Sequence, residues 1–151
     1  MSAATKKELI EACEAYVNSK LTNVQKVIDD LEAALKLETK CSMGDKYETD
    51  RAMLHLEFEK VAGQYEAFKK LRRTIRSIPH GRVDKNVIFG SAVKTTGANY
   101  FIAIPAGEIT AGGEKYYAIG ANAPVAQALL NRSAGDAVVF NGRTITINKV
   151  F

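Results

Sequence analysis

Two acidic side chains, Asp45 and Glu48, are the residues of this sequence best suited to chemistry. They lie three positions apart at the predicted start of a helix, so both carboxylates are on one side of its first turn. Carboxylate oxygens bind divalent cations, but two carboxylates are too few to hold Mg²⁺ unaided. A second interpretation is structural, because Asp at the N-cap and Glu at N3 form a capping box. The pair therefore predicts either a helix cap or part of a metal site that a partner completes.

Other patterns that carry catalysis are missing from the sequence. It contains no nucleophile elbow, phosphate loop, zinc-ligand spacing or dinucleotide fingerprint. The two histidines, His55 and His80, are isolated from each other and from other metal-ligating residues, and we assign them no role. The Gly112-Gly113 pair is interpreted as a turn.

Apolar residues in the first half of the chain repeat every seven positions, which is the a/d pattern of a coiled coil. The first ladder comprises Ile10, Val17, Val24 and Leu31 with Leu21, Ile28 and Leu35, and the second comprises Leu54, Val61, Phe68 and Ile75 with Phe58, Tyr65 and Leu71. The ladders mirror each other about Gly44 and Asp45, so we expect the chain to fold back there. The predicted helices run from about Thr5 to Glu38 and from Asp45 to about Ser77, with the turn at 39–44. Arms of this size would make a rod about 45 to 50 Å long with the acid pair at its tip.

The pattern changes from period seven to period two after Pro79 and Gly81, which stop a helix and supply a linker. We predict strands at 87–93, 100–104 and 115–119, then a short helix at 122–130. The last two strands, 137–140 and 143–149, flank Asn141-Gly142, a dipeptide typical of a two-residue hairpin turn. The predicted fold class is α+β: a coiled-coil hairpin at 1–78 with its acidic tip near 41–50, a linker at 79–82, and a small, mostly antiparallel sheet domain with one short helix at 83–151.

The composition bounds the class of protein. The chain has 151 residues, 46% of them hydrophobic and 25% charged, with a formal net charge of +4. These values are typical of a soluble folded protein, and no apolar run reaches the roughly 18 residues of a membrane helix. The first residues enter an amphipathic helix directly and lack the apolar core of a secretory signal. Cys13 in the first predicted helix and Cys41 beside the tip would lie about 40 Å apart, too far to form a disulfide within one chain, and reduced thiols are typical of the cytoplasm.

Basic residues concentrate at the end of the second predicted helix. Five cations fall within eight residues: Lys69, Lys70, Arg72, Arg73 and Arg76. Neither half of the chain is basic enough to bind nucleic acid through its overall field, since residues 1–78 carry 14 basic and 13 acidic side chains and residues 79–151 carry 7 and 4. Two interpretations remain for this basic cluster: a solvated helix end that complements the helix dipole, or a surface that contacts a partner.

These features together resemble the Gre family of bacterial transcript-cleavage factors, over nearly the whole chain. The helical hairpin with Gly-Asp-x-x-Glu at its tip is one part of the resemblance. The segment Val87-Ile88-Phe89-Gly90-Ser91-Ala92-Val93 resembles the first strand of that family's C-terminal domain. Its signature P-I-A-x-A-L-L-x-K-x-x-G-D-x-V is similar to the segment Asn122-Ala123-Pro124-Val125-Ala126-Gln127-Ala128-Leu129-Leu130-Asn131-Arg132-Ser133-Ala134-Gly135-Asp136-Ala137-Val138.

The resemblance implies a function that the isolated residues do not. The C-terminal half would be similar to FK506-binding-protein folds and would dock on RNA polymerase, while the rod enters the polymerase's secondary channel. Asp45 and Glu48 match the family's paired tip acids and would share Mg²⁺ with the polymerase near the RNA 3′ end. Lys46 and Tyr47 would be contacts to RNA or polymerase. The chain would then stimulate cleavage of backtracked RNA by the polymerase and would not be an enzyme itself. The resemblance also implies DNA binding, but only as a general property of transcription proteins.

Several alternatives stay open at the level of the sequence. The tip departs from the family pattern, since Lys46 lies between the two acids and the usual Leu-Ser after the first acid is missing. Some relatives share the architecture and inhibit the polymerase, so a regulator of initiation or pausing without cleavage is a second hypothesis. A third is a stand-alone module, either a coiled-coil chaperone or a prolyl isomerase. The aromatic residues available to an isomerase pocket are Phe89, Tyr100, Phe101, Tyr116 and Tyr117.

Overall fold

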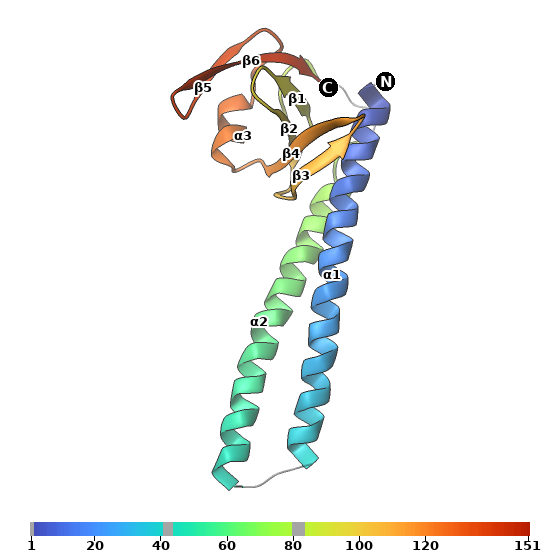
Figure 1. Cartoon of the computed structure of the whole chain (residues 1–151), viewed down its shortest axis with the longest axis vertical. Helices are drawn as coiled ribbons and strands as arrows, with labels where there is room; N and C mark the ends of the chain where they lie inside the picture. Colours follow the sequence, from blue (N-terminus) through green and yellow to red (C-terminus); the bar gives the residue numbers. More distant parts are fainter. Residues whose placement is uncertain (1, 41–43, 80–83) are drawn as a thin grey trace. The chain divides into compact units, whose positions relative to one another are not determined.

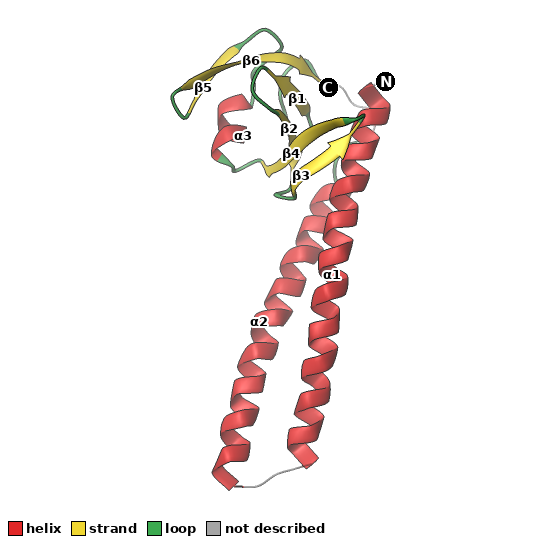
Figure 2. Cartoon of the chain, in the orientation of Figure 1, coloured by secondary structure: helices red, strands yellow, loops and turns green. Residues whose placement is uncertain are grey.

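The computed structural model describes residues 2–40, 44–79 and 84–151, and the side chains of residues 4–37, 48–79 and 84–151. The fold is α+β, with two long helices followed by a six-stranded sheet and one short helix (Figures 1 and 2). The elements are α1 (Ser2–Lys40), α2 (Gly44–Arg76), β1 (Ala92–Thr95), β2 (Asn99–Ala103), β3 (Gly107–Ala111), β4 (Glu114–Gly120), α3 (Pro124–Leu129), β5 (Ala137–Phe140) and β6 (Arg143–Val150). None of the helices in the described ranges is long and apolar enough to cross a membrane.

The chain forms two compact units, and the first turns of α1 belong with the sheet. We call Val17–Arg72 the arm, and Met1–Tyr16 together with Arg73–Phe151 the sheet unit. The predicted domain limits, 1–78 and 83–151, stay predictions. Of the predicted linker, only Pro79 falls within the described residues, because 80–83 lie outside them.

In the arm, α1 and α2 bury the residues that the seven-residue repeat predicts. Val17, Leu21 and Val61 are buried. The other ladder positions of the arm are half-buried between exposed neighbours: Val24, Ile28, Leu31, Leu35, Leu54, Phe58, Tyr65, Phe68 and Leu71. The predicted helices are confirmed, although α1 extends beyond both predicted ends, and α2 begins at Gly44 and ends at Arg76. The chain reverses between Lys40 and Gly44, as predicted, through residues 41–43, which lie outside the described part.

Burial along the arm decreases toward the point where the chain reverses. The three buried ladder residues lie in the half of the arm farther from the reversal, and from Val24 to Leu35 the ladder is only partly covered. Figure 1 shows why, since the two helices of the arm diverge toward Lys40 and Gly44. The seam between the helices is therefore tightest far from the acid pair.

The sheet has the strand order β3-β4-β2-β1-β6-β5, and its neighbours are antiparallel except for the parallel pair β2 and β4. The hairpin of β5 and β6 confirms the turn predicted at Asn141-Gly142, because both residues have positive φ, +52° and +74°. The short helix is confirmed as α3, with Pro124 in its first turn.

Two predictions about strands were wrong. The strand predicted at 87–93 begins only at Ala92, because the chain turns at Phe89 and Gly90. Gly90 has φ +88°, and a Cβ there would lie 3.0 Å from a methyl carbon of Ile78, so glycine allows both the turn and the close approach. The prediction also missed β3, an edge strand whose five residues bury only Ile109 and Ala111.

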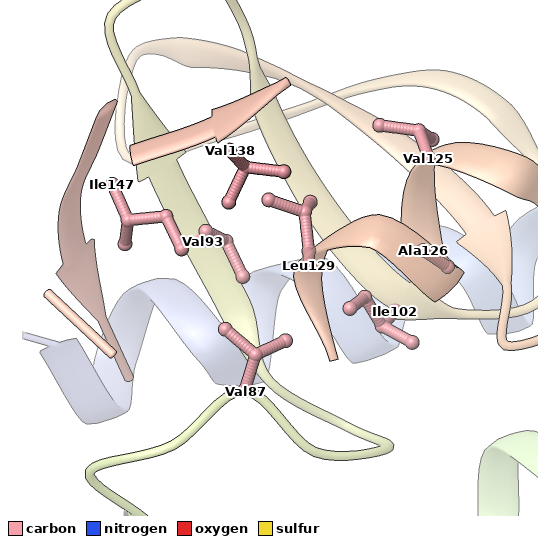
Figure 3. Close-up of a cluster of buried hydrophobic side chains, with 8 residues drawn as sticks. All are labelled: Val87, Val93, Ile102, Val125, Ala126, Leu129, Val138 and Ile147. Carbon is pink, nitrogen blue, oxygen red and sulfur yellow. The ribbon is translucent and has the colours of Figure 1, made fainter. Parts of the chain in front are cut away.

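The core of the sheet unit lies between α3 and the sheet (Figure 3). Val93 and Ile102 come from neighbouring central strands, Leu129 from α3 and Ile147 from β6. All four side chains are almost completely buried. Each removes apolar surface from water, which is the main favourable term in folding.

We expect Leu129→Ala to lower the free energy of unfolding by about 2 to 5 kcal/mol, because it leaves a cavity where a completely buried side chain packs. The measurement is urea unfolding followed by circular dichroism. Val139→Ala is the matched control, since Val139 is 69% exposed on the edge strand β5 and its truncation should change stability by about 0.5 kcal/mol or less. Equal losses in the two variants would contradict the assigned core.

Candidate functional site

The acid pair lies in the first turn of α2, at the end of the arm where the chain reverses. α2 begins at Gly44, so the backbone of Asp45 and Glu48 is helical and the two residues are one turn apart. Glu48 is exposed. The side chains of Asp45, Lys46 and Tyr47 lie outside the described residues, so their contacts and the capping hydrogen bonds stay predictions.

The described part of the chain does not form a complete metal site by itself. No group of three or more His, Cys, Asp or Glu side chains among the described side chains could hold a metal ion. Glu48 can offer two oxygens, and a hard cation such as Mg²⁺ takes six ligands. Within the described residues, the tip can therefore supply only part of a coordination shell.

The basic cluster is partly neutralised by nearby acids. Lys69 lies 3.8 Å from a carboxylate oxygen of Glu66, and its ammonium is 5.6 Å from the ring centre of Tyr65. In the sheet unit, Nε of Arg76 donates to Oε1 of Glu14 at 3.3 Å. Such exposed ion pairs are weak. Lys70 and Arg73 are exposed, and Arg72 is half-buried. Contact between this cluster and a partner stays a prediction.

The glycine pair predicted as a turn connects β3 to β4 and lies against the first turns of α1. Gly112 and Gly113 have φ values of +59° and +77°. The backbone N–H of Gly112 donates to Oε2 of Glu8 at 2.7 Å, and a Cβ at Gly112 would meet the hydroxyl of Thr5 at 3.0 Å. The turn therefore requires glycine and ties the start of α1 to the sheet. Of the two histidines, His55 is exposed on α2, and His80 lies outside the described residues.

The segment with the most specific sequence resemblance has a structural role. Val125, Ala126 and Leu129 are buried in the core. The carboxylate of Asp136 accepts hydrogen bonds from the backbone N–H and the hydroxyl of Ser133, at 2.8 and 3.3 Å. These contacts close the loop between α3 and β5. The motif therefore specifies the fold of the sheet unit, and the candidate chemistry remains on the arm.

The aromatic residues that an isomerase would need do not converge. Phe101 and Tyr116 are buried, whereas Tyr117 is exposed on the same strand as Tyr116 and its ring is 6.2 Å from that of Tyr100. Their side chains are divided between the two faces of the sheet, Phe101 and Tyr116 on one face and Tyr100 and Tyr117 on the other.

One cavity in the sheet unit could not be expected from the sequence patterns. Its volume is about 210 Å³, and its charged and polar lining comes from separate segments, including Thr5, Lys94, Glu114, Tyr116 and Lys149. These residues are far apart in the chain and follow no motif, so only the fold brings them together.

Cys13 is a buried free thiol in the first turns of α1. Burial raises the pKa of its thiol to about 12, so it stays protonated and unreactive at neutral pH. The buried neutral thiol contributes its full share to the free energy of unfolding below pH 9.0, the ordinary thiol pKa. This contribution is lost as the pH rises toward 12, because in that range the thiol of the unfolded chain ionises while the buried thiol stays protonated. Cys41, the second cysteine, lies outside the described residues.

No family model matches the chain, and no curated protein matches it. Among solved structures, the chain is similar to one titled as the structure of the transcription factor Gfh1, with a TM-score of 0.37 and 14% sequence identity. The alignment covers 92% of this chain and 93% of that chain. A likeness at this level does not establish a shared function.

We expect Cys13 to resist alkylation by iodoacetamide in the native protein. At pH 8, four units below its pKa, about one thiol in ten thousand would be ionised. The measurement is the labelling rate in a Cys41→Ser background, followed by mass spectrometry, with urea-unfolded protein as the control. A native rate equal to the unfolded rate would contradict the burial of Cys13.

Proposed function

We propose that this chain is a transcription factor of the Gre type, which binds RNA polymerase and stimulates cleavage of backtracked RNA. The observation that carries the proposal is the position of the acid pair: the arm reverses between Lys40 and Gly44, and Asp45 and Glu48 follow within the first turn of α2. The proposed activity comes from the sequence resemblance to the Gre family, and the geometry of the arm supports this proposal.

The arm has dimensions suited to a narrow channel. Where the two helices pack against each other, each about 10 Å across, the arm is roughly 20 Å wide. The part of α1 within the arm would span about 35 Å at about 1.5 Å per residue. Such an arm can carry two carboxylates into a site that a globular domain could not enter.

The tip supplies ligands to a site that another macromolecule completes. In the proposal, Asp45 and Glu48 contribute carboxylate oxygens, and the carboxylates of the polymerase and a phosphate of the RNA contribute the rest. Mg²⁺ bound there would supply a Lewis acid that activates water for hydrolysis. Lys46, the cation between the two acids, would pair with an RNA phosphate, and Tyr47 would contact RNA or polymerase. The chain itself would then be a factor and not an enzyme.

Docking would come from the rest of the chain. In the proposal, the sheet unit binds the polymerase in the manner expected of an FK506-binding-protein-like domain, and the basic cluster contributes charge to the contact. The proposal places the protein in the cytoplasm, where its partner works.

We expect Asp45→Asn and Glu48→Gln, singly and together, to abolish stimulated cleavage in arrested elongation complexes, because each removes an ionised ligand while keeping the side-chain shape. The rate of shortening of 3′-end-extruded RNA should fall about 100-fold or more, a loss typical of removing a group that stabilises developing charge. The measurement is gel analysis of labelled RNA after addition of the factor.

Glu59→Gln is the matched control, since Glu59 is an exposed acid on the same helix, eleven positions after Glu48, and should leave cleavage unchanged. Full cleavage by the double variant would refute the role of the acid pair. If the unmodified protein changes the lifetime of promoter complexes but not RNA cleavage, the chain is a secondary-channel regulator and the cleavage proposal is wrong.

We expect the double variant Lys70→Glu/Arg73→Glu to bind purified RNA polymerase about tenfold more weakly, because two exposed cations of the docking surface become anions. The measurement is the Kd by fluorescence anisotropy at two salt concentrations. Lys115→Glu is the control, since Lys115 is an exposed lysine on β4 outside the cluster. An unchanged Kd with an unchanged salt dependence would show that the cluster is only a solvated helix end.

A further inference from the structure

The cavity of the sheet unit contains several groups that attract an anion. Its volume of about 210 Å³ is enough for about seven water molecules at about 30 Å³ each. The lining residues all belong to the sheet unit: Thr5, Lys94, Ala111, Gly112, Glu114, Tyr116, Lys149 and Phe151. They come from α1, from β1, β3, β4 and β6, from the turn between β3 and β4, and from the residue after β6.

Two lysines and one glutamate are the charged side chains of the cavity lining. Nζ of Lys94 forms a salt bridge of 2.9 Å with Oε2 of Glu114, which leaves the remaining N–H donors of its ammonium for other acceptors. Nζ of Lys149 lies 5.3 Å from the ring centre of Phe151. Within the described ranges, Lys149 has no carboxylate partner. The lining side chains therefore carry two positive charges and one negative charge.

Tyr116 adds a neutral donor whose hydrogen bond is unused. Its side chain is only 1% exposed, and among the described residues its hydroxyl has no hydrogen-bond partner. No completely inaccessible side-chain oxygen or nitrogen in the described part lacks a partner, so the small exposed remainder of Tyr116 includes this hydroxyl. Tyr116 is also one of the residues that line the cavity. Burial raises the pKa of this phenol, with an opposing effect of Lys94, so it remains a donor at neutral pH.

We propose that this cavity binds a small phosphate-bearing ligand, with Lys94 and Lys149 pairing with the anion and Tyr116 donating a hydrogen bond to it. The accessible hydroxyl of Tyr116 can donate a hydrogen bond to an acceptor that enters the cavity. Hydrogen bonds from ammonium groups to phosphate oxygens are short and strong. A phosphate group has enough oxygens to accept from three separate donors, whereas an acetate has two. The site uses none of the residues of the acid pair, so it is independent of the proposed polymerase function.

The test is a titration of the ¹⁵N-labelled full chain with inorganic phosphate, followed by NMR at constant ionic strength with chloride as the balancing anion. We expect saturable shifts of the backbone amides of Lys94, Glu114, Tyr116 and Lys149. Tyr116→Phe and Lys149→Gln should each weaken phosphate binding about tenfold, the effect of losing one hydrogen bond to a charged group. Glu114→Gln should tighten it, because it removes the one negative side chain of the lining.

Two variants on the same strand serve as controls. Lys115→Gln and Tyr117→Phe alter neighbours of the lining residues that do not line this cavity, and they should leave the phosphate Kd unchanged. Shifts that do not saturate, or that chloride reproduces, would overturn the proposal, and equal affinity for acetate would overturn the assignment to phosphate. If Tyr116→Phe sharply lowers the melting temperature, the test rests on Lys149→Gln, which changes an exposed side chain. A phosphate Kd in Lys149→Gln equal to that of the wild type would then overturn the proposed site.

Discussion

The seam between α1 and α2 is the contact on which the proposed function depends. A single long helix would place the acid pair in its middle, but apolar residues at every third and fourth position force the chain to return along itself. Burial of Val17, Leu21 and Val61 supplies the favourable free energy for this return. Beyond these residues the seam is only partly buried. The acid pair is therefore positioned mainly by the continuous helix α2, whose other end packs better than the end that carries the acids. This division suits a tip whose final environment another molecule provides.

The sheet unit is held by different physics. Its core is a contiguous set of aliphatic side chains from α3, from four strands and from the segment before β1, and its loops are closed by hydrogen bonds such as those of Asp136 with Ser133. The first turns of α1 join this unit through buried Leu9 and Cys13 and through the contact of Glu8 with Gly112. One helix therefore contributes to two separately packed bodies. A change in its first turns acts on the sheet, and a change after Tyr16 acts on the arm.

Local patterns predicted the elements whose signal lies within a few residues. The heptads predicted both long helices, and Asn141-Gly142 predicted the last hairpin, because side-chain spacing and positive φ are properties of adjacent residues. The strand predicted at 87–93 was wrong because a turn at Gly90, packed against Ile78, interrupts an apolar run. β3 was missed because its own residues alternate only weakly between apolar and polar, and its pairing with β4 is what stabilises it as a strand. The position of the acid pair at the reversal could be predicted, whereas the cavity could not, since its lining residues become neighbours only after the sheet has formed.

In the proposed function, an incomplete site on a slender arm would also explain why the chain has a second body. Two carboxylates exposed to water bind a divalent cation weakly, and a tip that dissociates freely would seldom meet its partner site. If the sheet unit docks first, the tip is confined to a small volume, and its effective concentration at the partner reaches about the millimolar range without any added contact. Weak coordination by two acids is then sufficient, and the chemistry occurs only where docking has already selected the right macromolecule. Selectivity and reactivity are separated in this arrangement, the first in a packed sheet unit and the second in a few exposed residues at the start of α2.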